Sequence, residues 1–377
     1  MTASLKIHII AAALPPQLDG IGDYTANLAT ELARAASVTV LTGAPTPDPI
    51  PGVKVETVFS ADDPRSVWNL AARVAAEPPD WVLLQYNPFS YGRWGLNLHL
   101  PHVMRQLGRR NNVRVAVMAH ETYVPVVNWQ SAIMTVWQRW QFWRLGKCAD
   151  LLFFSTENPT HMYRRKFLQT PVVHLPVGSN IPFLPVSRVE ARTGLNIADD
   201  ALVLGLFGTM HISRMLERVR DAALTAQKVT GKAHVLYVGP HGPAVQSALG
   251  DIPLLIEGPL TGTEVSRRFA AMDVYLAPFS DGISTRRGTV MCGLQHGVAL
   301  VGTQGYNTDR MLKIEEGKAF LLADAKNSEQ FRNHVRLLAE QPSQRQALAR
   351  YGQRFFTQHF TWERIGSKLL AALESAA

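Results

Sequence analysis

Residues 278–303 read PFSDGISTRRGTVMCGLQHGVALVGT, in which a polar, glycine-rich loop, an apolar helical segment and a β-branched strand follow one another. Units of this kind are typical of parallel sheets flanked by helices. The glycines let a ligand approach the backbone, the first helical turn has N–H groups without partners, and the guanidiniums of Arg286 and Arg287 match phosphate in charge. The stretch predicts a site for an anionic ligand. The alternative is an ordinary surface loop with a solvated arginine pair.

The alternation of short β-branched runs and helical segments extends along the rest of the chain and occurs twice. In the first half, strands are predicted at residues 5–12, 37–43, 80–86, 113–120 and 150–156. In the second half, they are predicted at residues 201–208, 233–239, 253–258, 273–279 and 298–303. Residues 174–187, rich in Pro, Gly and Ser, are expected to link the halves. We predict an α/β fold of two Rossmann-like, doubly wound domains, residues 1–180 and 188–355, facing across a cleft.

The composition and motifs of the chain argue against several classes of protein. Of the 377 residues, 46% are hydrophobic and 18% are charged, and no apolar run approaches a membrane span. The first residues predict a strand rather than a signal peptide because His8 interrupts the apolar run, so we expect a cytoplasmic protein. Cys148 and Cys292 are too far apart for a CxxC motif, and no HExxH motif or Cys/His cluster occurs, so we expect no metal. The formal charge of +8 favours acidic ligands, but no nucleic-acid-binding motif is present.

The positive charge is concentrated in residues 101–180, which hold ten Lys or Arg against three Asp or Glu. Within them, residues 128–152 read NWQSAIMTVWQRWQFWRLGKCADLL. Such a helix could rest on an anionic membrane, at the inner face, and reach a lipid-linked acceptor. Aromatic residues at helical spacing more often fill a domain interior, and this second interpretation is favoured. The residues concerned are Trp129, Trp137, Trp140 and Trp143, with Arg139, Arg144 and Lys147.

Candidate site residues follow predicted strands, whose carboxyl ends border the ligand crevice of a doubly wound sheet. Each turn also has a purely structural explanation: a tight turn, a structural histidine or a solvated arginine. The candidates are Gly20 and Gly22 after the first strand, His120 and Glu121 after the fourth, and Gly208, Thr209 and Arg214 after the first strand of the second half.

In this order of elements the chain resembles the retaining glycosyltransferases of the GT-B fold, within them family 4, which uses nucleotide sugars. The resemblance runs nearly from end to end. It implies that the first domain binds the acceptor, that the second binds the nucleotide sugar, and that a C-terminal helix, residues 361–377, crosses back to the first domain. The matching segments are DGIGDYTANLATEL, MAHE, LPVGSNIP, FGTM, EGPLTGTEVSRRFAAMDVYLAPF, DGISTRRG, LQHGVALVGT and FTWERI.

The resemblance also implies roles for single residues. The turn at Gly22 matches the loop that faces the donor diphosphate, and His120 matches a histidine beside the donor sugar and the reacting centre. Arg214 takes the position of the basic residue that holds the leaving diphosphate. The segment around Glu257 matches the edge where backbone groups recognise the nucleobase. Asp281 takes the place of the first glutamate of a paired-glutamate motif, which contacts hydroxyls of the transferred sugar.

The chain departs from the family pattern in the same loop. The second glutamate, which would bind the ribose, is replaced by Thr289, and a basic residue five positions before Arg214 is replaced by Thr209. Arg286 or Arg287 could restore the lost charge, or one of them could be a structural ion-pair partner. The predicted nucleotide-binding set is Gly20, Gly22, Gly208, Thr209, Glu257, Ser284, Thr285, Arg286, Arg287, Gly288 and Thr289, and the predicted catalytic set is His120, Arg214 and Asp281.

The implied reaction moves a sugar from a nucleoside diphosphate donor to a hydroxyl of a glycan, a lipid-linked molecule or a small molecule, with the anomeric configuration retained. Positioned arginines and helix N-termini would stabilise the leaving diphosphate, so neither a metal nor a cofactor other than the donor is expected. Two alternatives remain open. One is another sugar-nucleotide enzyme of this fold, an epimerase or an enzyme with a non-sugar acceptor, and the other is a non-catalytic module that binds sugar nucleotides.

Overall fold

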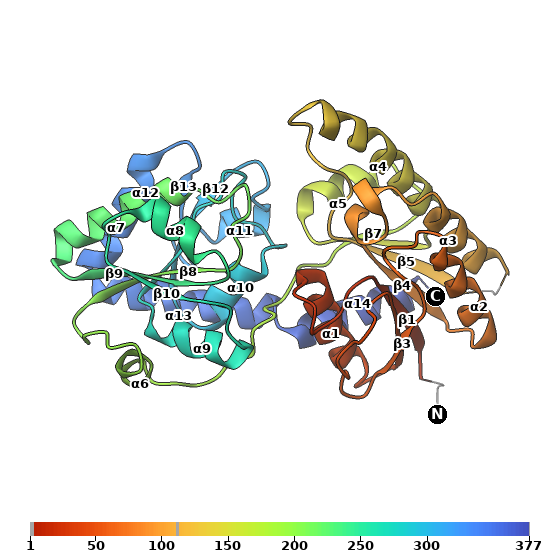
Figure 1. The fold of residues 1–377 in the computed structure, drawn as a ribbon, viewed down its shortest axis with the longest axis horizontal. Coiled ribbons are helices and arrows are strands. Elements are labelled where there is room, and N and C mark those ends of the chain that lie inside the picture. The colour runs from red at the N-terminus through yellow and green to blue at the C-terminus, as the bar shows by residue number, and fades with distance from the viewer. Residues whose placement is uncertain (1–3, 111–112, 377) are drawn as a thin grey trace. The chain divides into compact units, whose positions relative to one another are not determined.

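The computed structural model describes residues 4–110 and 113–376, which form two compact units, each with its own parallel sheet (Figure 1). Unit 1 comprises residues 1–176 and 362–377, and unit 2 comprises residues 177–361. The chain therefore leaves unit 1 once and returns to it with its last helix.

Unit 1 contains a seven-stranded sheet with the order β3-β2-β1-β4-β5-β6-β7. Its order reverses between β1 and β4, and in doubly wound folds such a switch point places a ligand crevice at the carboxyl ends of the strands. The strands are β1 (Lys6–Ala11), β2 (Ser37–Thr42), β3 (Lys54–Thr57), β4 (Trp81–Tyr86), β5 (Arg114–Ala119), β6 (Leu151–Phe154) and β7 (Val172–His174).

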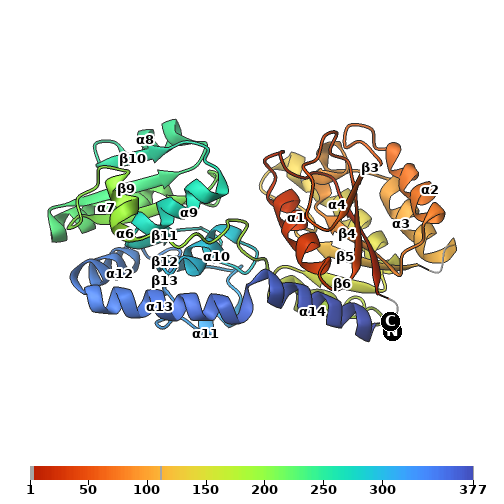
Figure 2. The same ribbon diagram turned by 90° about the horizontal axis from the view of Figure 1, so that it is seen from below.

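Helices cover both faces of this sheet. The helices α2, α3 and α4 pack through one apolar cluster on one face, and α1 and α14 pack together on the other (Figure 2). The helices are α1 (Gly20–Leu32), α2 (Asn69–Ala76), α3 (His99–Arg110), α4 (Trp129–Cys148), α5 (Glu157–Arg164) and α14 (Trp362–Ser375), with short 3-10 turns η1 (Ser66–Trp68), η2 (Pro88–Ser90) and η3 (Arg93–Gly95).

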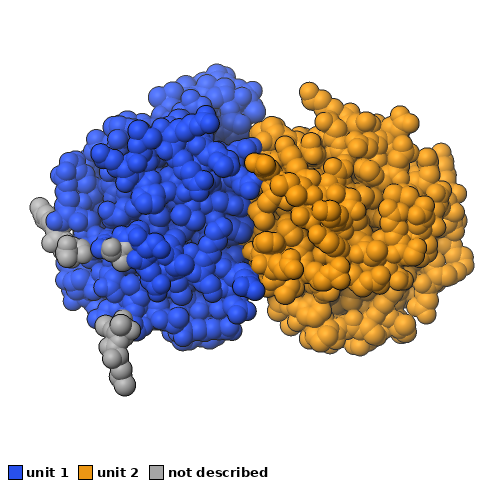
Figure 3. Space-filling view, turned by 180° about the vertical axis from the view of Figure 1, so that it is seen from behind, with its two compact units in different colours: residues 1–176, 362–377 blue, residues 177–361 orange. Residues whose placement is uncertain are grey.

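The last helix belongs to unit 1, although the chain reaches it from unit 2 (Figure 3). Ile365, Leu369 and Leu373 are buried at a spacing of four residues, which places them on one face of α14. A Cβ atom at Gly366 would lie 2.8 Å from Cγ of Glu31, so the glycine permits the close approach of α14 to α1. The predicted return of the C-terminal helix to the N-terminal domain is confirmed.

Unit 2 contains a six-stranded parallel sheet with the order β10-β9-β8-β11-β12-β13. Its switch point lies between β8 and β11. The strands are β8 (Leu202–Phe207), β9 (Ala233–Val238), β10 (Leu254–Glu257), β11 (Val274–Ala277), β12 (Ala299–Gln304) and β13 (Leu321–Asp324). The helices are α6 (Arg188–Thr193), α7 (Leu216–Thr230), α8 (Gly242–Leu249), α9 (Gly262–Ala271), α10 (Gly288–Gln295), α11 (Arg310–Ile314), α12 (Ser328–Glu340) and α13 (Pro342–His359).

All ten predicted strands are present, and the alternating pattern predicted the α/β fold correctly. Three further strands, β3, β7 and β13, were not predicted. Each has only three or four residues and lies at an edge of its sheet. An edge strand is flanked on one side only, and β3 has no fully buried residue, so its hydrophobic pattern is weak.

Candidate functional site

Two loops meet at the switch point of the unit 2 sheet. The loop after β8 forms an antiparallel bridge to the loop after β11, through Arg214 and Phe279. Two backbone hydrogen bonds extend this contact: the Met215 N–H donates to the Pro278 carbonyl at 3.0 Å, and the Ser280 N–H donates to the Ser213 carbonyl at 2.7 Å. The bridge holds Arg214 at the carboxyl edge of the sheet, where doubly wound folds bind ligands.

The Arg214 guanidinium has hydrogen-bonding capacity that the described part of the chain does not use. Its Nη2 donates to the Phe207 carbonyl at 2.9 Å, and its Cζ lies 4.8 Å from the centre of the Phe279 ring. Its Nε and Nη1 are buried and form no hydrogen bond of good geometry with the described residues. The neutral Tyr275 hydroxyl interacts with the guanidinium but brings no counter-charge. Burial lowers the pKa of Arg214, but an arginine stays protonated in proteins. Because an unpartnered buried donor costs about 1–3 kcal/mol, the geometry suits an anionic ligand.

Gly208 and the start of α10 border the same guanidinium. Gly208 has a φ of +99°, and a Cβ atom there would lie 2.8 Å from Cγ2 of Thr289 and 3.8 Å from Nη2 of Arg214. Thr289 is the second residue of α10, whose N-terminus has no side-chain cap. The Tyr237 hydroxyl donates to the Gly208 carbonyl at 3.0 Å and fixes the turn. A buried cation and an uncapped helix N-terminus therefore lie together, and both favour a phosphate.

Asp281, by contrast, is occupied by neighbouring groups and is only 5% exposed. Its Oδ1 accepts from Nη2 of Arg287, and its Oδ2 accepts from Nδ2 of Asn307 at 3.0 Å. Burial alone would raise the pKa of the Asp281 carboxyl, but the charge of Arg287 and the hydrogen bond from Asn307 outweigh it and lower that pKa below its usual value. Asp281 is thus an anion that holds the loop together.

Arg287 serves this loop and not an open site. Its Nη2 also donates to the Ser213 hydroxyl at 3.1 Å, and its Nε donates to the Gly282 carbonyl at 3.3 Å. Burial lowers the pKa of Arg287 to about 10, so it remains charged at neutral pH. Arg286 is more exposed, and its Nη2 lies 3.5 Å from Oδ2 of Asp281. Of the two alternatives for the arginine pair, Arg287 has the contacts of a structural ion-pair partner.

The other predicted residues of unit 2 have varied surroundings. The Ser284 hydroxyl is buried without a hydrogen-bond partner among the described residues, whereas Thr285 donates through its N–H and its hydroxyl to Oδ2 of Asp309. Gly288 opens α10, and Thr209 is exposed. Glu257 ends β10, two strands from β8, and its carboxylate accepts from Arg268 at 3.0 Å. The Glu257 side chain is therefore held in an ion pair with Arg268, whereas the backbone groups predicted to recognise the nucleobase take no part in that ion pair.

In unit 1, the turn at Gly20 and Gly22 already contains an anion. The Asp19 carboxylate caps α1 and accepts from the N–H groups of Ile21 at 2.9 Å and Gly22 at 2.6 Å. A Cβ atom at Gly22 would lie 3.0 Å from the Ala13 carbonyl oxygen, so this glycine permits the tight turn between β1 and α1. The N-terminus of α1 differs in this respect from that of α10.

His120 follows β5 and is held by its neighbours. Its Nε2 lies 2.8 Å from Oε1 of Gln85, and its ring contacts the edge of the Tyr24 ring at a centroid distance of 4.9 Å. Burial lowers the pKa of His120 to about 3, so the imidazole is neutral at pH 7. It can give or accept a hydrogen bond there, but it does not exchange a proton near neutral pH.

Sequence reasoning missed two residues of these turns. Asp23, one turn after Asp19, has a pKa that burial, and then the Asp19 charge, raise to about 6. The motif DGIGD contained the signal, because carboxylates four residues apart lie side by side on a helix. Asn307, which holds Asp281, is 26 residues away in sequence, and no local pattern marked it.

A cavity of about 690 Å³ opens at the carboxyl edge of the unit 1 sheet. Its lining comes from the segments that follow β1, β2, β3 and β4, which surround the switch point of this sheet. Its volume is in the range of small-molecule sites. Among the residues that the structure describes, no group of three or more His, Cys, Asp or Glu could hold a metal ion. The polar residues of the lining are Gln17, Asp19, Thr57, Ser60, Asp62, Asn87 and Ser90.

Solved structures of known proteins share this fold. Anabaena Alr3699/HepE, in a crystal structure with UDP-glucose, has a TM-score of 0.72 and 15% identity over 98% of this chain and 100% of its own. WaaG, a glycosyltransferase involved in lipopolysaccharide biosynthesis, has a TM-score of 0.70 and 15% identity over 97% of this chain and 98% of its own. A putative UDP-N-acetylglucosamine 2-epimerase from Listeria monocytogenes has a TM-score of 0.63 and 14% identity over 99% of this chain and 96% of its own.

These likenesses confirm the predicted fold class, an α/β chain of two Rossmann-like domains of the GT-B type. No protein-family model matches the sequence, and no curated protein sequence matches it.

Proposed function

We propose that this protein is a glycosyltransferase that moves a sugar from a nucleoside diphosphate donor to a hydroxyl acceptor with retention of configuration. The observation that carries the proposal is the Arg214 guanidinium, whose Nε and Nη1 are buried without partners beside the uncapped N-terminus of α10. The shared fold supports it, since one protein of that fold was crystallised with UDP-glucose and another is a glycosyltransferase.

In this proposal Arg214 and α10 hold the diphosphate. A guanidinium can direct two N–H groups at phosphate oxygens, and the helix N-terminus adds partial positive charge. Both would stabilise the negative charge that develops on the leaving diphosphate, the largest electrostatic requirement of the reaction. Gly208 keeps the backbone close to the same position because it lacks a side chain. No metal ion is part of the proposal.

Asp281 and His120 receive narrower roles than the resemblance implied. Asp281 is paired with Arg287 and Asn307, so we assign it the role of holding the loop between β11 and α10 in place. Other groups of this loop would then contact the sugar hydroxyls. His120 is neutral, and we assign it a hydrogen bond to a sugar hydroxyl, not proton transfer. The proton of the acceptor hydroxyl passes to the departing phosphate, so the mechanism requires no separate base.

We assign the acceptor to the 690 Å³ cavity of unit 1, because its polar lining can bind hydroxyl groups. Asp19 and Asp62 contribute carboxylates to this lining, and Asn87 contributes an amide. The acceptor class, glycan, lipid-linked molecule or small molecule, is left to experiment. We also propose that the enzyme works in the cytoplasm or at the inner face of the membrane.

The test begins with a thermal-shift screen against nucleoside diphosphates and nucleotide sugars, since a ligand that binds the folded state raises its melting temperature. The nucleotide sugar with the largest shift is then incubated with the protein and acceptors, and the products are identified. Glycosylated product supports the proposal. An isomerised sugar nucleotide would instead identify an epimerase, and binding without turnover a non-catalytic module. If no nucleotide shifts the melting temperature, the donor assignment is wrong.

A further inference from the structure

Along most of its length, the helix α4 turns polar side chains inward and apolar side chains outward. Phe142 and Leu145 near its C-terminus are the buried apolar exceptions. Ser131, Thr135, Gln138 and Gln141 are buried, whereas the helix exposes Trp129, Ile133, Val136, Trp140 and Trp143. The exposed residues are spaced by four, three, four and three positions, so they form one stripe along the helix. Water normally faces the polar side of a helix. The interpretation that the tryptophans fill the domain interior is wrong for Trp129, Trp140 and Trp143, which are 72%, 38% and 51% exposed.

The inverted orientation of α4 is fixed by hydrogen bonds. Oε1 of Gln138 accepts from the Val124 N–H at 2.8 Å, and its Nε2 donates to the Trp94 carbonyl at 3.3 Å. Oε1 of Gln141 accepts from the Asn97 N–H at 2.7 Å, and its Nε2 donates to the Tyr86 hydroxyl. Because buried amides satisfy backbone groups of neighbouring loops, rotation of α4 about its axis would leave those groups without partners.

Apolar residues of the flanking loops are exposed on either side of these contacts. Trp94 is 57% exposed, and its carbonyl accepts from Nε1 of Trp137 on α4 at 3.1 Å. Leu98 follows the Asn97 that Gln141 holds, and it is exposed as well. Val126 and Val127, just before α4, are also exposed. Scattered apolar side chains are ordinary on a surface, but this number of them on one helix and the loops bonded to it is typical of an interaction site.

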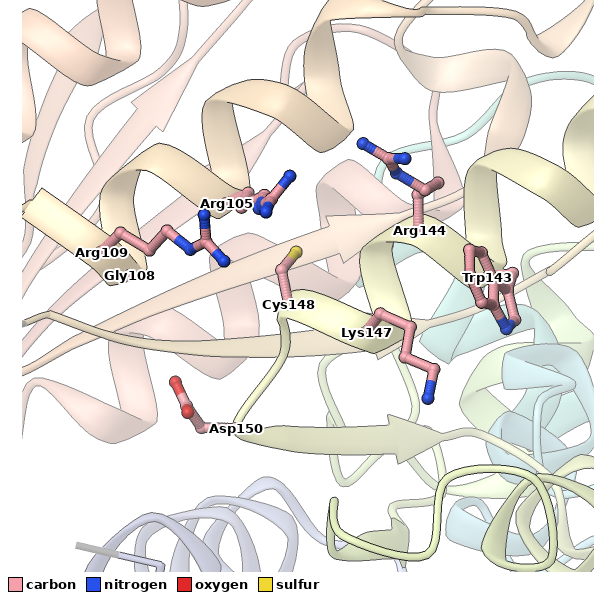
Figure 4. Close-up of a pocket in the computed structure, with 8 residues that line it drawn as sticks. All are labelled: Arg105, Gly108, Arg109, Trp143, Arg144, Lys147, Cys148 and Asp150. Atoms are coloured by element: carbon pink, nitrogen blue, oxygen red, sulfur yellow. The ribbon is translucent and has the colours of Figure 1, made fainter.

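Cations accompany the stripe and gather at its end. A cavity of about 480 Å³ lies between the C-terminal parts of α3 and α4 (Figure 4). Trp143 of the stripe lines this cavity together with four cationic side chains and one carboxylate, that of Asp150. The Asp150 carboxylate already accepts a hydrogen bond from the Val115 N–H at 2.8 Å. None of the four cations forms an ion pair with a carboxylate in the part of the chain that the structure describes. They are Arg105, Arg109, Arg144 and Lys147.

We propose that the α4 stripe and this basic cavity, here called the α4 surface, dock on a membrane that contains anionic lipids. Indole rings and aliphatic side chains favour the interface between water and lipid, and arginine and lysine beside them attract acidic headgroups. The described residues include no helix long and apolar enough to cross a bilayer, so the contact is peripheral. A second copy of the chain fits less well. The helix α4 has no acidic residue, and a symmetric pair would bring its cations together.

Sedimentation with vesicles tests the proposal. The protein is mixed with vesicles of phosphatidylcholine alone or with vesicles in which about a third of the lipid is phosphatidylglycerol, which gives them a negative surface potential. We expect sedimentation only with the anionic vesicles, and less of it at high salt because salt screens the attraction. Replacing Trp140 and Trp143 with Gln should weaken binding at least tenfold. Each of Arg105→Gln and Arg109→Gln should weaken it about fivefold, the equivalent of about 1 kcal/mol per cation.

Matched controls come from exposed residues elsewhere. Leu168→Ser removes an exposed apolar side chain of unit 1. Arg220→Gln and Lys228→Gln each remove an exposed cation of unit 2. All three variants should bind vesicles like the wild type. Unchanged circular dichroism melts would show that the α4 variants fold. The proposal is overturned if the wild type ignores anionic vesicles, or if it is a dimer that Trp140→Gln and Trp143→Gln convert to a monomer. Vesicle binding requires no nucleotide, so its failure leaves the proposed glycosyl transfer untouched.

Discussion

Two arginines of unit 2 lie over the same phenylalanine ring, yet their surroundings differ. Cζ of Arg287 is 3.6 Å from the centre of the Phe279 ring, and Cζ of Arg214 is 4.8 Å from it. Arg287 is paired with the buried carboxylate of Asp281. Among the described residues, Arg214 forms no ion pair with a carboxylate, and two of its donors form no hydrogen bond of good geometry. The difference indicates that a charged residue stabilises the fold where its counter-ion belongs to the protein, and serves a ligand where the counter-ion must come from outside.

The largest effect is expected from Arg287→Met, which leaves Asp281 buried beside a neutral side chain. Breaking one side of a buried ion pair should lower the free energy of unfolding by about 3 kcal/mol. Urea denaturation measures it. Arg286→Met is the matched control, because Arg286 is more exposed and farther from Asp281, and it should cost less than about 1 kcal/mol. Equal losses for both variants would contradict the distinction between the two arginines.

Arg214→Met should have the opposite profile. The variant loses the hydrogen bond to the Phe207 carbonyl, which lowers stability, but it also removes two buried donors without partners among the described residues, which raises it. These effects oppose each other, so the free energy of unfolding should change by less than about 1 kcal/mol. UDP serves as the probe because a protein of the same fold was crystallised with UDP-glucose. Affinity for it should fall about 30- to 100-fold, or 2–3 kcal/mol, because charge-assisted hydrogen bonds to phosphate are lost. Arg220→Met, an exposed arginine of α7, controls for net charge. A large loss of stability with unchanged UDP affinity would make Arg214 a second structural arginine.

Gly208→Ala probes the space beside Arg214. The left-handed φ of +99° and the 2.8 Å approach of a Cβ atom to Thr289 should together cost about 1–2 kcal/mol of stability. UDP binding should weaken as well, because the turn shifts against Arg214. Thr289→Ser in the same chain removes the methyl group that clashes and should recover part of both losses. If the double variant behaves like Gly208→Ala, the contact with Thr289 is not the cause.

His120 is also a buried basic group but, unlike the two arginines, it can lose its charge by deprotonation. Its pKa of about 3 lies below the value of about 6.5 expected in the unfolded chain. The unfolded chain therefore binds more protons between these values, and stability should fall as the pH drops below about 6.5, by about 1.4 kcal/mol per pH unit. His120→Gln should reduce this slope in urea denaturation between pH 6.5 and 4.5. An unchanged slope would assign the acid sensitivity to other buried histidines.

The sequence predicted the fold and the strand ends well because both depend on local patterns. Buried strands such as β8 are continuous apolar runs, and the turn after β8 is marked by Gly208. The different environments of Arg214 and Arg287 were not predictable. They depend on the position of the Asp281 carboxylate, and Asn307, which is distant in sequence, helps to hold that carboxylate beside Arg287. The outward tryptophans of α4 were missed for a similar reason. Gln138 and Gln141 become core residues only through backbone groups of distant loops.

The central claim is that Arg214 recognises the diphosphate of the donor. Isothermal titration calorimetry of UDP and of uridine with the wild type and Arg214→Met tests it most directly, since the two ligands differ only in the diphosphate. We predict that the wild type binds UDP at least about thirtyfold more tightly than uridine, about 2 kcal/mol or more, and that Arg214→Met loses most of this preference. A variant that keeps the full preference for UDP would contradict the claim.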